Sequence, residues 1–174
     1  MFVSESCFVL PGWRSVVAAA LAVPVLALAA GCGGASEAEA GGCASKAEGR
    51  NADEKYLTAE VAKLRVLPEG VCLSSVDTTE LTEQPGKISV RFNLSAAAST
   101  SPEDLRPAAT DLAYFLKKTP LLFIRTAAVE VSNAGYAKAP YRALLSDPAF
   151  GAHPWNGTPS RDADQARWAT VPLG

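Results

Sequence analysis

Few side chains in this sequence have a type and spacing that support catalysis. His153 is the single histidine, and no G-x-S-x-G motif accompanies it, so no serine hydrolase triad is predicted. Asp162 and Asp164 match half of a calcium loop, but the Gly and distal Glu of that motif are missing. Glu80 and Glu83 lead into a predicted turn, where water solvates both carboxylates. We therefore expect no metal, no cofactor and no recognisable catalytic residue.

The candidate binding residues come from the clearest pattern in the chain, an alternation of apolar and polar residues over 88–95. Such a period of two predicts a strand with one face toward the core and one toward water or a partner. The polar face carries Ser89, Arg91 and Asn93, which we predict as a binding surface. The alternative is an ordinary solvated face.

The elements around that strand follow from spacing and turn residues. Leucines and valines three and four residues apart predict a helix at 53–67, and a similar pattern predicts a helix that begins at Ser101 or Asp104 and ends near 118. Strands are predicted at 71–81, 88–95 and 122–132, and a short helix at 141–146. The order is helix, strand, strand, helix, strand, which predicts an α+β fold with a sheet of about three strands and both helices packed on one face.

The N-terminal segment has the pattern of a targeting signal. Residues 16–30 carry no charge, and these fifteen residues are fewer than the ~20 that a transmembrane helix needs. Leu28-Ala29-Ala30-Gly31-Cys32 resembles the lipobox of bacterial lipoproteins, and the Ala-rich, Ile-poor composition is typical of high-GC bacteria such as actinobacteria.

The lipobox resemblance implies a signal peptide at 1–31 and a diacylglyceryl group, with acyl chains such as palmitate, on Cys32. The mature protein is then expected outside the cytoplasm in the cell envelope, held on the membrane by two acyl chains. The alternative is a secretory signal that is cleaved elsewhere and leaves Cys32 as a thiol.

If Cys7 leaves with the signal and Cys32 carries lipid, the exported chain keeps Cys43 and Cys72. Outside the cytoplasm such a pair most simply forms a disulfide. A metal site would need further ligands, which a chain with one His lacks.

The distribution of large apolar residues predicts the domain limits. Residues 32–50 hold none and are expected to be a flexible tether, while 51–150 hold most of them and are expected to fold. The C-terminal tail, 151–174, contains Trp155 and Trp168, which either dock on the domain or leave the tail disordered.

Function is predicted only as a class. A chain with 16 basic and 18 acidic residues has no electrostatic reason to bind nucleic acid. We expect a membrane-anchored lipoprotein that acts as a non-catalytic binding or accessory module for an envelope protein or a small ligand. The alternative is an extracytoplasmic hydrolase with an unrecognised carboxylate-based site.

Overall fold

The structure, a computed structural model, describes residue 47 and residues 49–173, which form an α+β fold. The described residues contain five strands, where about three were predicted. The strands are β1 (Val71–Glu80), β2 (Ile88–Ala96), β3 (Thr126–Ser132), β4 (Ala143–Asp147) and β5 (Ala169–Pro172). The helices are α1 (Ala52–Lys63), α2 (Arg106–Lys117), α3 (Pro120–Phe123) and α4 (Arg161–Gln165), and a 3-10 turn, η1 (Pro102–Leu105), precedes α2.

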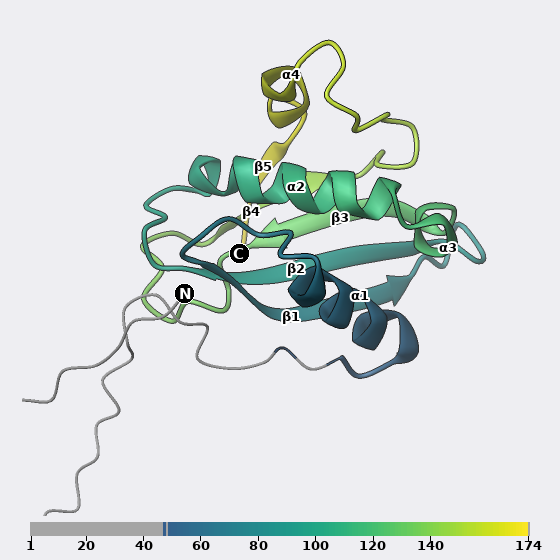
Figure 1. Cartoon of the computed structure of the whole chain (residues 1–174), viewed down its shortest axis with the longest axis horizontal. Coiled ribbons are helices and arrows are strands. Elements are labelled where there is room, and N and C mark those ends of the chain that lie inside the picture. Colours follow the sequence, from purple (N-terminus) through teal and green to yellow (C-terminus); the bar gives the residue numbers. More distant parts are fainter. Residues whose placement is uncertain (1–46, 48, 174) are drawn as a thin grey trace, which may run out of the picture. The chain divides into compact units, whose positions relative to one another are not determined.

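The strands lie side by side in the order in which they follow one another along the chain. β2 and β3 run parallel, and the other neighbouring pairs are antiparallel. Because a parallel pair needs a crossover, the chain passes through η1, α2 and α3 between these two strands (Figure 1). The predicted order is confirmed as far as β3, and β4 and β5 extend the sheet beyond it.

Two sequence predictions are wrong at the level of single elements. The predicted helix at 141–146 is instead strand β4, whose backbone pairs with β3 on one side and β5 on the other. A short apolar run such as Leu144-Leu145 fits a helix or a strand, and only the neighbouring strands decide between them. The predicted strand at 122–132 begins at Thr126, because Pro120 starts the helical turn α3.

Of the two predicted starts of the long crossover helix, Ser101 is confirmed as the cap of η1, whereas Asp104 does not cap α2, whose N-cap is Leu105. The Asp104 carboxylate accepts the Thr100 and Ser101 amides at 2.8 and 3.0 Å, which closes the start of η1. The chain then continues as α2, with Pro107 in its first turn, where a missing amide donor leaves no hydrogen bond unmade.

One core holds both long helices against the same face of the sheet. Ile88, Val90, Phe92 and Leu94 of β2 are buried and belong to one cluster with residues of α1 and α2. The helices supply residues three and four positions apart to this cluster, among them Leu57 and Val61 from α1 and Leu105, Ala109, Leu112 and Leu116 from the crossover. The opposite face of β2 carries the polar half of the alternation, as predicted.

The C-terminal segment is part of the described fold and contributes α4 and β5. Trp155 and Trp168 are almost completely buried, and their ring centroids lie 4.9 Å apart. Trp168 Nε1 donates to Thr110 Oγ1 of α2 at 3.2 Å. The two tryptophans therefore dock on the helix-covered side of the sheet and not across its polar face.

Candidate functional site

A groove lies between helix α1, the loop that follows it and the first residues of the edge strand β1. Its volume is about 860 Å³, and small-molecule sites in proteins occupy roughly 300 to 1,000 Å³. We call it the α1–β1 groove. Its walls are mainly apolar and include Val61, Ala62, Leu67, Pro68, Val71 and Leu73.

The groove exists because α1 ends early and the chain turns back sharply. The helix was predicted to reach residue 67, but it ends at Lys63, and Arg65 adopts a positive φ of 48°. The Val71 amide then bonds to the Pro68 carbonyl at 3.2 Å around Gly70, whose φ of 78° suits glycine. The loop between helix and strand thus stands off the helix and forms one end of the groove.

A buried carboxylate links the first turn of α1 to strand β1. Glu54 is about 1% exposed, and its carboxylate accepts the Arg50 amide at 2.7 Å and the Thr78 amide of β1 at 2.9 Å. The Arg50 guanidinium reaches both Glu54, at 3.2 Å, and Asp77, at 2.6 Å. Burial raises the pKa of Glu54, but the hydrogen bonds from Arg50 and Thr78 outweigh it and lower the pKa to about 2.

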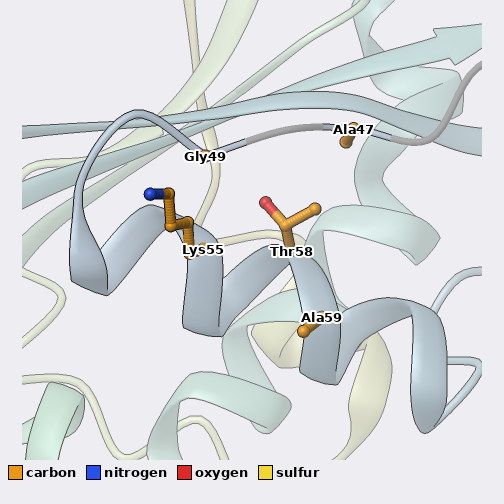
Figure 2. Close-up of a pocket in the computed structure, with 5 residues that line it drawn as sticks. All are labelled: Ala47, Gly49, Lys55, Thr58 and Ala59. Carbon is orange, nitrogen blue, oxygen red and sulfur yellow. The ribbon is translucent and has the colours of Figure 1, made fainter.

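The Thr58 hydroxyl is the polar group inside the site. Thr58 is only 9% exposed, and its Oγ1 makes no hydrogen bond within the described part of the chain. A second cavity of about 300 Å³ shares Ala47, Thr58 and Ala59 with the groove and adds Gly49 and Lys55. Figure 2 shows the Thr58 side chain on the side of α1 that faces Ala47. A buried hydroxyl without a partner costs about 1 to 3 kcal/mol, which a ligand that bonds to it would recover.

Charged residues line the rim of the two cavities. Lys55 borders the smaller cavity, and Arg65 and Glu69 border the groove. All three side chains are exposed, and Lys55 and Arg65 make no ion pair with any described residue. The cationic side chains of Lys55 and Arg65 are thus available to a ligand in the α1–β1 groove, and the Glu69 carboxylate lies on the same rim.

The predicted cysteine sites are placed only in part. Cys72 lies in β1 and lines the α1–β1 groove, as does Ala47, four residues after Cys43. Cys32 and Cys43 lie outside the described residues, so lipidation and the disulfide stay predictions. Within residues 49–173 and at residue 47, no helix is long and apolar enough to cross a membrane.

The predicted binding residues Ser89, Arg91 and Asn93 do share the sheet face that the helices leave uncovered. Arg91 forms an ion pair with Glu130 at 2.6 Å, and Asn93 donates to Asp77 at 2.7 Å. Asn93 also bonds to Ser75 and accepts from Ser132, each at 2.8 Å. Arg91 and Asn93 are therefore already bonded to side chains of the neighbouring strands β1 and β3, and a partner would have to compete with those bonds. Binding at this face remains a prediction.

His153 is held by a buried aspartate that the sequence analysis did not single out. Asp147 is 1% exposed, and its Oδ2 lies 2.9 Å from both His153 Nδ1 and Trp155 Nε1. Its other oxygen accepts the Ala149 amide at 3.0 Å. A carboxylate that orients an imidazole is one part of a hydrolytic triad. Neither cavity is lined by His153 or Asp147. The bonds from His153 and Trp155 to Asp147 hold this part of the C-terminal segment against β4, and we call them the Asp147 clasp.

The acidic residues discussed in the sequence analysis are either buried within the fold or exposed to solvent. Asp164, which matches half of a calcium loop together with Asp162, is fully buried, and its carboxylate accepts hydrogen bonds from the Tyr114 hydroxyl at 2.9 Å and the Gly157 amide at 2.8 Å. Glu80 and Glu83 are exposed, as expected. The described residues contain no group of three or more His, Cys, Asp or Glu side chains arranged to hold a metal ion.

The sequence contained one signal for part of this site. Asn51 and Glu54 have the spacing of a helix cap, and Asn51 Oδ1 does accept the Glu54 amide at 2.9 Å. Thr58 had no signal, because the residues that line the cavities with it, Ala47 and the start of β1, are remote from it in sequence. No family model, no curated protein and no solved structure matches this chain.

Proposed function

We propose that this protein is a non-catalytic binding module of the cell envelope, anchored by lipid on Cys32, whose α1–β1 groove takes an amphiphile with a long apolar chain and an anionic head group. The observation that carries the proposal is the apolar groove of about 860 Å³ with one buried, unpartnered hydroxyl, that of Thr58. A rigid groove with few polar groups binds by burying apolar surface and selects by hydrogen bonding.

The chemistry of the groove supports a long-chain carboxylate as the ligand. Methylene groups would lie against residues such as Val61 and Leu73, and each one buried contributes about 0.8 kcal/mol. The Thr58 hydroxyl or the cationic side chains of Lys55 and Arg65 would bond the carboxylate. The negative charge of Glu69 on the rim repels an anion. The anionic head group is therefore favoured at the Lys55 end.

The hydrolase alternative receives no comparable support. The buried carboxylates Glu54, Asp147 and Asp164 all accept several hydrogen bonds within the described fold, and none of them lines either cavity. It remains a hypothesis.

Filling the groove is expected to abolish ligand binding. In vesicles that carry the mature protein, a sixteen-carbon fatty acid with a photoreactive diazirine should label peptides within 55–73, and unlabelled fatty acid should compete. Ala62→Trp places a bulky ring in the groove, so labelling there should fall at least about tenfold, the equivalent of ~1.4 kcal/mol.

The matched control for this experiment is Ala52→Trp, because Ala52 is exposed on the same helix and lines neither cavity. The fatty acid should label the Ala52→Trp variant as strongly as the parent protein. Thr58→Val, which removes only the hydroxyl, should weaken labelling a few-fold. Equal labelling of the parent and Ala62→Trp would exclude the groove, and no labelling of the parent within 55–73 would refute the proposed ligand class.

The processing prediction is tested by one mass measurement. The membrane-extracted protein should have the mass of residues 32–174 plus a diacylglyceryl group, with or without a further acyl chain, and should be lighter by the two thiol hydrogens lost in a Cys43–Cys72 disulfide. Peptide mapping without reductant should recover the linked pair. A soluble product that begins elsewhere would contradict the anchor, and alkylation of both cysteines in the native protein would contradict the disulfide.

A further inference from the structure

Three large apolar side chains project from the short helix α3 and the residue after it. Leu121 is 84% exposed, Ile124 is 67% exposed and Phe123 is 36% exposed. Single exposed hydrophobic residues are ordinary, but three within four positions of one short turn are a feature that interaction sites share. We call Leu121, Phe123 and Ile124 the α3 tip.

The α3 tip is held firmly by the residues between and beside its members. Leu122 points into the core and is 4% exposed. Thr126 Oγ1 donates to the Leu122 carbonyl at 2.8 Å, and Thr119 Oγ1 donates to the Phe115 carbonyl at 3.0 Å. Because the backbone of the turn is already ordered, a contact made by the exposed side chains loses little conformational entropy.

Three lysine residues lie at or next to the α3 tip. Lys87 Nζ donates to the Ile124 carbonyl at 2.7 Å, Lys117 Nζ lies 4.6 Å from the Phe123 ring centroid, and Lys118 is exposed just before α3. None of these three lysines forms an ion pair with a described residue. Arg125 follows the tip and is paired with Asp53 at 2.8 Å.

The acidic groups at this end of the molecule are fewer. The turn between β1 and β2 lies at the same end of the sheet as α3 (Figure 1), and it brings the exposed Glu80 and Glu83. Lys87 and Lys117 contact the tip itself and Lys118 lies just before α3 in the chain, whereas these carboxylates belong to the turn and its preceding strand. The immediate border of the apolar patch is therefore basic.

We infer that the α3 tip enters the head-group region of an anionic lipid bilayer, with Leu121 and Ile124 inserted and Lys87 and Lys118 facing the lipid phosphates. Three side chains bury far less than the ~800 Å² per partner that a stable protein interface needs, so a second chain is a poor occupant. A lipid surface needs no such area, because each inserted methylene contributes about 0.8 kcal/mol and each lysine near an anionic leaflet about 1 kcal/mol.

This inference rests on the proposed lipid anchor, which would keep the domain at the membrane. A weak contact becomes persistent when a tether holds both surfaces at high effective concentration. The tip then determines which end of the domain faces the bilayer.

The test uses the mature, lipid-anchored chain in phosphatidylcholine vesicles with about 30 mol % phosphatidylglycerol. A phosphatidylcholine with a diazirine in its acyl chain, present as a trace in every vesicle, should label Leu121 and Ile124. The double variant L121S/I124S should lower labelling of peptides within 118–126 at least fivefold with unchanged thermal stability, because both side chains are exposed. K87E/K118E should lower it in these vesicles and not in pure phosphatidylcholine.

The matched control is Leu64→Ser, since Leu64 is 56% exposed at the end of α1. This variant should leave labelling at 118–126 unchanged. Labelling of Leu64 as strong as that of Leu121, no labelling of the tip, or crosslinks from the tip to a second protein chain would each overturn the inference. Flotation separates the two proposals: protein that does not float with vesicles contradicts the anchor, whereas protein that floats with an unlabelled tip contradicts the membrane contact alone.

Discussion

Replacing Asp147 by Ala is expected to lower the free energy of unfolding by about 3 to 4 kcal/mol. The carboxylate is almost completely buried and accepts three hydrogen bonds, from His153, Trp155 and the Ala149 amide. Its loss leaves the Trp155 indole donor buried without a partner, and an orphaned buried donor costs about 1 to 3 kcal/mol beyond the lost bonds. Urea unfolding followed by tryptophan fluorescence at neutral pH measures the change.

The variant Asp162→Ala provides the matched control for this experiment. Asp162 is exposed, and no described residue donates a hydrogen bond to its side chain, so its removal should change stability by less than about 0.5 kcal/mol. Asp147→Asn should fall between the two, because one amide oxygen remains as an acceptor. If Asp147→Ala were as stable as the parent, the C-terminal segment would not depend on this clasp.

Replacing Glu54 by Gln is expected to destabilise the protein by about 2 to 3 kcal/mol at pH 7, with a loss that disappears in acid. Burial raises the pKa of Glu54, but Arg50 and Thr78 hold it at about 2, against 4.5 for an unperturbed Glu. A shift of one pKa unit corresponds to about 1.4 kcal/mol, and we reduce the total because Arg50 is largely exposed to solvent.

The direction of the pH effect follows from the lowered pKa. The unfolded chain takes up a proton near pH 4.5 and the folded protein only near pH 2, so the stabilisation is complete above about pH 4.5 and is lost as the pH falls toward 2. Parent and Glu54→Gln unfolding curves, measured at several pH values between 7 and 2, should therefore converge in acid. Glu83→Gln, at an exposed turn, should differ little from the parent throughout. A parent–variant difference that is independent of pH would contradict a role for the charge.

The elements with strong local patterns were predictable. The alternation of residues 88–95 predicted β2 and both of its faces, because a strand buried on one side must place every second side chain in the core. The leucine spacing around α2 predicted a helix for the corresponding reason. The predictions were wrong for segments with weak local patterns, whose secondary structure depends on neighbouring strands. The segment of β4 was predicted as a helix, but its backbone hydrogen bonds are made with β3 and β5.

The candidate groove lay beyond sequence reasoning. Thr58 sits on a helix whose pattern looked ordinary, and the cavities that it lines also include Ala47 and residues of β1, which lie elsewhere in the chain. Asp147 had no signal in the sequence, and it is a buried hydrogen-bond acceptor because His153 and Trp155 fold back onto it. In both cases the chemistry of the side chain depends on residues that the local sequence does not contain.

The amino-acid sequence by itself determined the α+β class, the central strand with its polar face and the crossover helix, since these depend on periodicities that a segment carries alone. Only the tertiary structure decided the five-stranded sheet, the burial of Glu54, Thr58 and Asp147, and the exposure of the α3 tip. Burial, exposure and charge stabilisation depend on distances between segments remote in sequence, and those distances exist only once the chain has packed.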